Sequence, residues 1–507
     1  MAEAAAARRR LFALLALALL AGGVHAWSMA PVARGWLEVL SVAALLALAR
    51  AAPPSRAWLV GGAFGLAWLG GTFWWLFISM YRYGHLPAWL AALAVALLAA
   101  LLSVYLALAT ALFVRWKRDR LGPDLLLWCA LWLLAELARA QLFTGFPWGA
   151  AGYAQVDGPL ATLAPWVGVY GIGAVAAGLG LLVQRGLAMS GALPRLGAVA
   201  ATGALVLLPA WTGGEFTRAR ASLSVTLLQG NVPQDEKFEF SRLPDTLDWH
   251  IKALLASTAD LVIAPETAIP LLPAQLPPGL WDGLKNHFAQ GRTRALVGVP
   301  LGDAEQGYTN SVAGFGARVG SPVYRYDKHH LVPFGEFIPP GFRWFVDMMQ
   351  MPLGDFARGP LVAPSFAVGA ERVGPNICYE DLFGEELAAR FVDAATAPTV
   401  LANVSNIGWF GESVAVDQHL LISRMRTLEL QRPMVRATNT GATVAIDHRG
   451  VVTHRLAPHA RGVLQAQVQG REGTTPFAWW AGRLGLWPLW VLALGAVAVV
   501  VRRRKPN

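Results

Sequence analysis

The sequence predicts a polytopic α-helical membrane protein with about eight transmembrane helices and one α/β domain outside the membrane. Two observations support this fold class. Of the 507 residues, 55% are hydrophobic and only 15% are charged, whereas soluble domains average about a quarter charged. The apolar residues gather in eight segments near the two ends of the chain, while the long segment 213–482 is polar enough to fold in water.

Most of the apolar segments reach the roughly 20 residues that a helix needs to cross a hydrocarbon core of about 30 Å. We expect spans at 11–27, 35–52, 57–81, 87–115, 123–142, 165–184, 193–211 and 485–501. The chain then divides into a membrane domain of seven helices (1–212), an extramembrane domain (213–482), and a C-terminal helix with a basic tail (483–507). The first segment begins like a signal peptide, but no small-residue cleavage site follows it, so we expect an uncleaved helix.

The net charge of +10 is unevenly distributed. Segment 213–482 holds 23 Lys/Arg and 26 Asp/Glu, while the rest of the chain holds 19 and 6. This distribution argues against a nucleic-acid partner, because the basic residues follow the apolar segments. With eight crossings, 15 Lys/Arg flank the spans on the side of both termini and 4 on the other. By the positive-inside rule we expect both termini in the cytoplasm and segment 213–482 outside it.

Within the extramembrane segment, short apolar runs alternate with helical stretches, which predicts an α/β domain. We expect strands at 223–232, 260–270, 294–301, 311–319, 399–411 and 442–456, and helices near 243–257, 279–290 and 415–430. Several polar residues fall where strands end. That is the edge at which α/β sheets usually build their sites.

Cys378, in "NICYED", is the candidate nucleophile. It follows an apolar run and precedes a stretch that is typical of a helix, and a thiol near helix N–H groups has its pKa lowered from about 8.5. The alternative is a buried small hydrophobe, the usual role of a free cysteine. The other cysteine, Cys129, lies in a predicted membrane helix, so we expect no disulfide within the chain.

A nucleophilic cysteine needs a base. His329 and His330 are candidates, and so is a carboxylate beside a lysine. Glu266 ends an apolar strand in "APETAIP", and "YDKHHLVPFGEFIP" supplies Lys328 and Glu336. The histidines and cysteines show no metal-ligand spacing, so we expect no metal and no cofactor.

The fifth predicted span and the loop after it carry unusual residues for a membrane. Glu136 and Arg139 lie three apart on one helix face, as a local ion pair or as a contact for lipid headgroups. The loop "TGFPWGAAGYAQ" (144–155) carries Trp148 and Tyr153. It is either an aromatic belt or a partly buried loop that lines a substrate entrance.

Together, "PET", "KHHLVPFGEF" and "NICYED" resemble the Glu-Lys-Cys triad of the nitrilase superfamily in order and rough spacing. The triad domain lies between seven apolar helices and one C-terminal helix. With "FPWGAAGYAQ", "QGNVPQDEKF" and "NVSNIGWFG", the chain resembles the apolipoprotein N-acyltransferases, bacterial inner-membrane enzymes that complete lipoprotein maturation. The resemblance covers nearly the whole chain. One position departs from it, because Phe238 stands where we expect this family to carry Trp.

The resemblance implies an αββα nitrilase-like domain and gives each triad residue a role. Glu266 would be the general base, Lys328 would stabilise the thiolate and the oxyanion, and Cys378 would carry the acyl group as a thioester. Glu336 would orient the lysine or the base as a second carboxylate.

Other residues of these motifs would support the reaction. The backbone N–H of Tyr379 would add to the oxyanion hole, and Glu380 would either position the acceptor amine or brace the turn. Trp409 and Phe410 would line an acyl channel, or they are core aromatics under a loop. The expected substrate-binding residues are Trp148, Tyr153, Phe238, Trp409 and Phe410.

The implied reaction transfers a fatty acyl chain from a membrane phospholipid to the N-terminal amine of a diacylglyceryl-modified cysteine on an apolipoprotein. The expected partners are these two substrates and the bilayer. We expect a monomer in the inner membrane with its catalytic domain in the periplasm. One alternative is a membrane-tethered nitrilase-like amidase or hydrolase with water as acceptor. Another is a transporter, which predicts several charges at mid-membrane.

Overall fold

The structure, a computed structural model, describes residues 1–31, 33–189, 191, 197, 200, 203–204, 214–237, 239, 241–316, 320–344 and 355–502. The chain forms two compact units. The helical unit comprises Met1–Phe77, Ala88–Gly214 and Leu484–Asn507, and the α/β unit comprises Ile78–Pro87 and Glu215–Arg483. A short piece of the predicted membrane region, Ile78–Pro87, therefore belongs to the α/β unit.

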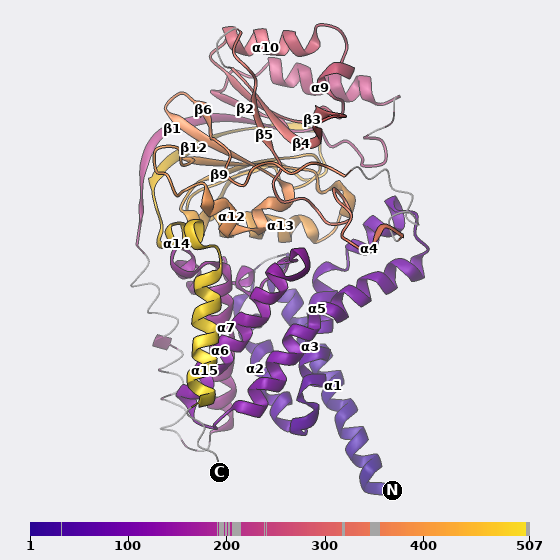
Figure 1. Cartoon of the computed structure of the whole chain (residues 1–507), viewed down its shortest axis with the longest axis vertical. Coiled ribbons are helices and arrows are strands. Elements are labelled where there is room, and N and C mark those ends of the chain that lie inside the picture. The colour runs from indigo at the N-terminus through magenta and orange to yellow at the C-terminus, as the bar shows by residue number, and fades with distance from the viewer. Residues whose placement is uncertain are drawn as a thin grey trace. The chain divides into compact units, whose positions relative to one another are not determined.

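Long apolar helices build the helical unit (Figure 1). They are α1 (Ala2–Met29), α2 (Gly35–Ala51), α3 (Ala57–Phe73), α5 (Ala88–Trp116), α6 (Leu121–Gln141), α7 (Ala164–Ala188) and α15 (Trp487–Arg502). By length and composition, four helices in the described part of the chain can cross a membrane, namely α1, α5, α6 and α7. The number becomes six if two bent pairs, one with α3 and one with α15, each count as one span.

Two of the eight expected spans need separate comment. Segment 35–52 forms α2, whose 17 residues make it shorter than the four clear spans. Segment 193–211 lies mostly outside the described residues. Several apolar helices near the N-terminus are thus present, and the count of eight stays a prediction.

Small residues let the helices approach closely. A Cβ atom built on Gly61 of α3 would lie 2.5 Å from Thr110 Oγ1 of α5, and one on Gly65 would lie 2.8 Å from Ser103 Cβ. Lipid tails are as apolar as leucine, so burial of apolar surface does not drive helices together in a bilayer. Close van der Waals packing of this kind holds them instead.

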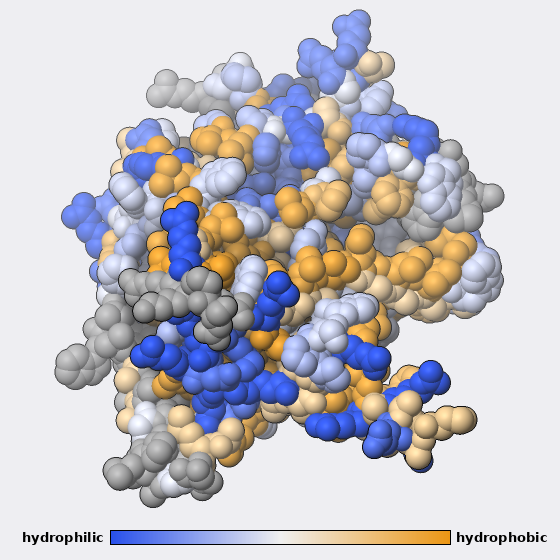
Figure 2. All heavy atoms as spheres, turned by 60° about the horizontal axis from the view of Figure 1, so that its bottom comes forward, coloured by the Kyte–Doolittle hydropathy of each residue, from blue (hydrophilic) through white to orange (hydrophobic). Residues whose placement is uncertain are grey.

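Basic side chains gather at one end of the helical unit. Asp119 lies 2.8 Å from Arg50, 2.7 Å from Lys117 and 3.6 Å from Arg185. Arg118 donates to a backbone carbonyl in the last turn of α15. The start of α1 and the end of α15 lie at this end in Figure 1, and Figure 2, which turns it forward, shows blue, hydrophilic side chains there. All four basic residues belong to the set that the charge distribution assigns to the side of both termini.

A segment of short 3₁₀ helices (Leu142–Thr144, Ala151–Gln155 and Pro159–Leu163) joined by irregular backbone lies inside the helical unit between α6 and α7. Arg139 Nη1 donates to the carbonyl oxygens of Phe146 and Trp148 at 2.9 and 2.8 Å, and Glu136 Oε1 accepts from the backbone N–H of Ala151 at 3.1 Å. Irregular backbone at membrane depth needs such internal partners. Glu136 and Arg139 also pair at 3.4 Å, and both are only 3% exposed. They therefore hold this loop and are not placed to contact a lipid headgroup.

Trp148 and Tyr153 belong to the interior of the helical unit. Their exposed fractions are 3% and 0%, and the Trp148 ring lies 4.8 Å from the ring of Trp75. The expectation of an aromatic belt is therefore wrong for these two residues, because belt residues face the membrane surface. That the loop 144–155 lines a substrate entrance stays a prediction.

The same interior buries two ionisable side chains that the sequence patterns did not single out. Glu38 accepts from Gln155 Nε2 at 2.6 Å, and His25 Nδ1 lies 2.8 Å from Ser41 Oγ. Gln155 belongs to the segment between α6 and α7, so Glu38 helps to hold it in the same way as Glu136. Glu38 thus supports the local structure of this segment, while His25 contacts α2.

Two six-stranded sheets form the α/β unit. Their strand orders are β12-β1-β2-β3-β4-β5 and β11-β10-β9-β8-β7-β6. The strands of the first are β1 (Thr217–Gln229), β2 (Leu261–Ile263), β3 (Arg294–Asp303), β4 (Gly307–Phe315), β5 (Tyr324–Asp327) and β12 (Gly462–Gly473). Those of the second are β6 (Phe366–Val368), β7 (Glu371–Ile377), β8 (Val400–Ser405), β9 (Met434–Thr438), β10 (Val444–Ile446) and β11 (Val452–Arg455).

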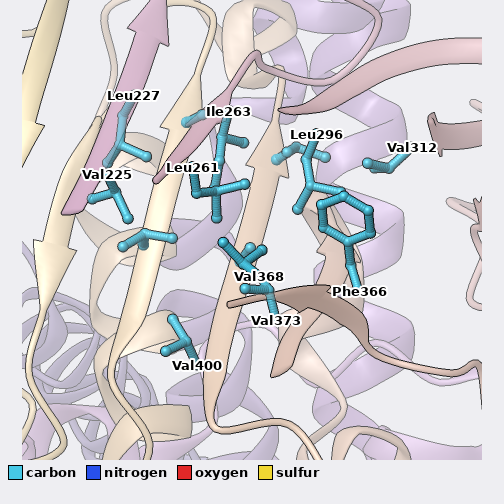
Figure 3. Packing of buried hydrophobic residues seen from close by; sticks show 14 of the residues in the cluster. Val225, Leu227, Leu261, Ile263, Leu296, Val312, Phe366, Val368, Val373 and Val400 are labelled. Carbon is cyan, nitrogen blue, oxygen red and sulfur yellow. The ribbon is translucent and has the colours of Figure 1, made fainter. Parts of the chain in front are cut away.

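The sheets face each other across an apolar core (Figure 3). Val225, Leu261 and Leu296 project from the first sheet, and Val373 and Val400 project from the second. All five are at most 1% exposed. Burial of such a side chain stabilises the fold by about 1.5–3 kcal/mol. This shared core fixes the two sheets against each other.

Helices cover the outer face of each sheet (Figure 1). They are α9 (Leu243–Leu255) and α10 (Leu280–Gln290) on the first, and α12 (Gly384–Ala389) and α13 (Ala415–Leu430) on the second. Leu254 and Phe288 pack under the first pair, and Leu387 and Leu430 pack under the second. The result is the four-layer αββα arrangement that the resemblance implies.

Local structure differs from the sequence prediction in several places. The expected strand 260–270 is only β2, Leu261–Ile263, and the expected strand 399–411 ends with β8 at Ser405, before the 3₁₀ turn Ile407–Phe410. The expected strand 442–456 is two strands, β10 and β11, because the chain turns back at Asp447–Gly450. The helix expected directly after Cys378 begins as the 3₁₀ turn Cys378–Leu382, and α12 follows it with only six residues.

Candidate active site

The candidate catalytic residues meet at one edge of the sheets. Because β3 and β5 both run antiparallel to β4, β5 runs in the same direction as β2 and β3. Glu266 comes three residues after β2, Lys328 directly follows β5, and Cys378 directly follows β7. Each therefore lies at the carboxyl end of a strand, where α/β sheets commonly carry their functional groups.

Cys378 occupies a sharp turn. Its φ is +51°, a left-handed conformation that residues other than glycine rarely adopt. Asn403 Nδ2 and His419 Nε2 lie 3.3 and 3.2 Å from its carbonyl oxygen, and Ser405 Oγ donates to its Sγ at 3.3 Å. The residue is partly exposed. Its neighbours thus hold a strained backbone that presents the thiol, as is common at functional sites.

Glu266 lies in the turn after β2 and is 8% exposed. Its Oε1 accepts from Asn310 Nδ2 at 2.7 Å, and its Oε2 accepts from the backbone N–H of Asn406 at 2.7 Å. Lys328 Nζ lies 3.6 Å from Oε1. A Cβ atom on Gly298 of β3 would lie 2.2 Å from the carbonyl oxygen of the residue before Glu266. Only glycine permits that approach, which places the carboxylate at the edge of the sheet.

Lys328 is fully buried between two carboxylates. Its Nζ donates to Glu336 Oε1 at 2.9 Å in addition to its contact with Glu266. Glu336 Oε1 also accepts from Asn310 Nδ2 at 2.6 Å, and Oε2 accepts from the backbone N–H of Val332 at 2.8 Å. Asn310 therefore bridges the two carboxylates. The sequence analysis missed it, because Asn310 directly precedes the expected strand 311–319 and lies between the polar residues Thr309 and Ser311.

The charges of this cluster act in opposite directions on the lysine and the thiol. Burial would lower the pKa of Lys328, but Glu336, Glu266 and Cys378 together raise it above its usual value. Burial and then Glu266 raise the pKa of Cys378 to about 12, although Lys328 and the Ser405 hydroxyl oppose them. The expected lowering of the thiol pKa is therefore wrong. The thiol is protonated near neutral pH, so its reaction as a nucleophile requires a base.

Glu380 is fully engaged within the turn. Its Oε2 accepts from Tyr326 Oη and from the backbone N–H of Ile377, both at 2.7 Å. Its Oε1 accepts from the backbone N–H groups of His329 and His330 at 2.7 and 3.3 Å. Of its two expected roles, these four donors favour bracing the turn. The neighbouring Tyr379 is also buried, and its ring packs 5.3 Å from that of Phe383.

The two candidate histidine bases have other partners. His330 Nδ1 lies 2.9 Å from Glu386 Oε1, its ring stacks on Phe383 at 3.5 Å, and burial lowers its pKa to about 3. His329 Nδ1 lies 2.8 Å from the carbonyl oxygen of Gly359. These contacts do not favour a histidine base.

A buried network of side chains from α13, β9 and the turn after β7 supports the backbone of Cys378. His419 Nε2 lies 2.9 Å from Asp381 Oδ1, and Arg436 Nη1 lies 3.3 Å from Asp381 Oδ2. Arg436 Nη2 lies 3.0 Å from His419 Nδ1. Because a guanidinium only donates, Nδ1 accepts and Nε2 carries the proton that reaches the Cys378 carbonyl. The sequence analysis missed this network, whose members are up to 55 residues apart.

The candidate substrate-binding residues do not form one group. Trp409 and Phe410 are partly exposed in the 3₁₀ turn Ile407–Phe410, and the Trp409 ring lies 5.5 Å from that of Tyr83. Phe238 lies outside the described residues. Trp148 and Tyr153 belong to the helical unit.

The arrangement can be compared with known proteins. Residues 21–182 match the apolipoprotein N-acyltransferase N-terminal domain, and residues 224–477 match the carbon-nitrogen hydrolase family. The apolipoprotein N-acyltransferase of Verminephrobacter eiseniae is 55% identical over 480 residues, which cover 89% of this chain and 88% of that one. The apolipoprotein N-acyltransferase of Ralstonia nicotianae is 47% identical over 503 residues, with coverage of 96% and 93%.

A solved CN-hydrolase superfamily protein from Xanthomonas campestris covers 53% of this chain and 96% of its own, with 18% identity and a TM-score of 0.37. The relatives above are far more similar, and they extend over both units. On that basis, this chain belongs to the apolipoprotein N-acyltransferase family.

Proposed function

We propose that this enzyme transfers a fatty acyl chain from a membrane phospholipid to the N-terminal amine of the diacylglyceryl-modified cysteine of an apolipoprotein. One observation carries the chemistry: the thiol of Cys378, protonated at neutral pH, lies at the same edge as a carboxylate–lysine pair. Family membership supports the choice of substrates. The reaction proceeds in two halves through a thioester on Cys378.

In the first half, Glu266 accepts the proton of the Cys378 thiol as Sγ attacks the carbonyl carbon of the phospholipid ester. The carbonyl oxygen becomes an oxyanion, which the Lys328 ammonium and the backbone N–H of Tyr379 stabilise. The oxyanion then collapses and the C–O bond breaks. The leaving alkoxide takes the proton from Glu266 and departs as a lysophospholipid.

In the second half, the neutral α-amine of the acceptor attacks the thioester carbonyl carbon. Glu266 accepts a proton from the attacking nitrogen, and Lys328 again faces the oxyanion. The C–S bond breaks, the amide forms, and Cys378 Sγ recovers its proton from Glu266. Glu336 keeps Lys328 in place in both halves, because it is the nearer of the two carboxylates.

Because both substrates carry lipid chains, the proposed reaction requires an enzyme that is embedded in a membrane. Taking an acyl chain of roughly 14 methylenes into water would require on the order of 11 kcal/mol at about 0.8 kcal/mol per CH₂. The donor therefore reacts while its chain stays in lipid or in apolar protein surroundings. We place the enzyme in the bacterial inner membrane as a monomer, with about eight spans and with the α/β unit on the periplasmic side. The basic residues around Asp119 support this orientation.

The test is mass spectrometry of the purified full-length protein after incubation with phospholipid vesicles. The expected result is a fatty acyl adduct on Cys378 that a diacylglyceryl lipopeptide removes. Cys378→Ser and Glu266→Gln should both lose the adduct, because a serine hydroxyl is less acidic than a thiol and because Gln is no base.

Cys129→Ser is the matched control and should keep the adduct, since Cys129 lies on α6 of the helical unit. An adduct on Cys129 would refute the mechanism. An adduct on Cys378 that water removes as fast as the lipopeptide does would instead indicate a hydrolase.

A further inference from the structure

Lys237 is a second lysine beside the candidate active site. It lies on the loop after β1, in "QGNVPQDEKF", and is 4% exposed. Its Nζ donates to the backbone carbonyl oxygen of Glu266 at 3.0 Å. Because β1 and β2 are parallel neighbours, this loop leaves the same edge of the sheet as the turn that carries Glu266. The contact therefore joins two loops of the candidate site.

Neighbouring side chains hold the loop of Lys237 in place. Asn439 accepts from the backbone N–H of Val232 at 3.0 Å and donates to the carbonyl oxygen of Val232 at 2.8 Å. Gln234 Oε1 accepts from Asn406 Nδ2 at 2.8 Å. The backbone N–H of Asn406 is also the group that donates to Glu266. The loop, the turn of Glu266 and the end of β8 are thus connected by hydrogen bonds.

The two lysines of the site have different partners. Lys328 lies between the carboxylates of Glu336 and Glu266, whereas Lys237 donates to a neutral carbonyl oxygen. Burial lowers the pKa of Lys237 to about 8, although the charges of Glu266 and Cys378 raise it in part. Lys237 is therefore able to change its charge close to physiological pH, while Lys328 stays protonated.

We propose that Lys237 is a positioning residue for acyl transfer, which holds the backbone of Glu266 and adds a positive charge that favours the Cys378 thiolate. This role rests on the proposed function of Cys378 as the nucleophile. The hydrogen bond to the Glu266 carbonyl oxygen holds the ammonium of Lys237 at the site, where its charge interacts with that of Cys378. An ammonium that interacts with a thiol favours the charged form of the thiol. Lys237 would therefore assist Glu266 each time the thiol loses its proton.

The other groups that face Lys237 do not titrate in the same range. His250 of α9 interacts with it, and burial lowers the pKa of His250 to about 4, so this imidazole is neutral at higher pH. On its loop, Asp235 pairs with Arg82 and Glu236 with Arg242 at the surface, and Glu239 is exposed. Arg461, which also acts on His250, is a permanent cation that donates to the carbonyl oxygen of Gly230. A change in Cys378 reactivity near pH 8 would therefore report on Lys237.

The test is the pH dependence of Cys378 alkylation by iodoacetamide, measured by mass spectrometry on the full-length protein in detergent with Cys129→Ser. Lys237→Met removes the charge, and Lys237→Arg keeps it at every pH used. Lys252→Met is the matched control, because Lys252 of α9 is 76% exposed and pairs with Asp248 at the surface.

We expect Lys237→Met to be alkylated roughly tenfold more slowly than the wild type at pH 7, which corresponds to one unit in the thiol pKa. At pH 10 the difference should shrink to less than about twofold, because the wild-type lysine has then lost its own charge. The alkylation rate of Lys237→Arg should match that of the wild type at pH 7 and should exceed it at pH 10. Lys252→Met should follow the wild type throughout.

If the alkylation rate of Lys237→Met relative to that of the wild type were the same at every pH, the role of Lys237 would be merely structural and the proposal would be overturned. A Lys237→Arg profile that follows the wild type at pH 10 would also overturn it. The arginine variant decides the question if the methionine variant does not fold. Iodoacetamide requires neither lipid nor acceptor, so this outcome is separate from the acyl adduct that tests the proposed function.

Discussion

At the scale of single residues, the candidate site shares one buried ammonium among three acidic groups. Lys328 faces Glu266, Glu336 and Cys378, and its raised pKa reflects all three. Two carboxylates so close together would repel each other. Asn310 supplies two N–H donors without adding charge, one to each carboxylate. A neutral donor thus holds the two carboxylates together next to one lysine.

Replacing Asn310 with Leu tests this arrangement. Both carboxylates would lose a buried donor, at about 1–3 kcal/mol for each unsatisfied group. We expect thioester formation in a single turnover to slow by more than about tenfold, which corresponds to 1.4 kcal/mol. Asn286→Leu, on the exposed face of α10, is the control and should leave the rate unchanged. Equal rates for both variants would show that the amide has no such role.

At the scale of elements, the turn after β7 depends on helix α13 and strand β9. Burial alone would raise the pKa of Asp381, but His419, Arg436 and Ser423 outweigh it and hold the pKa below its usual value. The stability from this carboxylate is therefore present above roughly pH 4 and is lost as the pH falls further. These elements carry a network that reaches the carbonyl oxygen of Cys378.

His419→Ala should weaken this support. It removes a donor from the Cys378 carbonyl and leaves Asp381 and Arg436 partly unsatisfied in the interior. Breaking a buried charged network typically costs about 3–5 kcal/mol, and we expect a loss near the lower value because Asp381 keeps Arg436 and Ser423 as partners. Denaturant unfolding of the protein in detergent measures this change in the free energy of unfolding.

His454→Ala is the control for this variant, since His454 is exposed on β11. We expect its free energy of unfolding to stay within about 0.5 kcal/mol of the wild type. If His419→Ala were as stable as His454→Ala, the network would not support the turn.

At the scale of the whole molecule, charge sets the expected orientation in the membrane. Arg50, Lys117 and Arg185 lie around Asp119 at the end of the helical unit that carries the start of α1 and the end of α15. The cytoplasmic side of a membrane protein retains such basic loops. The α/β unit is nearly neutral by comparison and is expected on the opposite side.

Reporter fusions test the orientation. An enzyme that is active only outside the cytoplasm should be active when fused at residue 300 and inactive when fused after Arg504. The reason is the excess of basic residues on the side of both termini. A cytoplasmic fluorescent reporter provides the reciprocal control and should give the opposite pattern. An active C-terminal fusion with the first reporter would contradict a cytoplasmic C-terminus and therefore the eight-span arrangement.

The sequence by itself determined the features that depend on local composition. Apolar length specified the membrane helices, because a span must match the thickness of the bilayer. Polar residues after apolar runs indicated Glu266 and Cys378, because the ends of strands are local signals. Lys328 was expected in a loop, and the resemblance to the nitrilase motifs gave it a role. Alternation of strands and helices specified the α/β class. The number of spans remains the least determined of these features, since α2 is short and two helix pairs are bent.

Only the tertiary structure decided the features that depend on distant segments. Strand β12 pairs with β1 across some 240 residues, and no local pattern contains that partner. The direction of the Cys378 pKa shift reversed because remote elements bury the thiol beside Glu266. Only the contacts of Glu266 identified Asn310 and Lys237, which lie 44 and 29 residues away in the sequence. Burial and through-space charge arise from packing between segments, so sequence spacing does not reveal them.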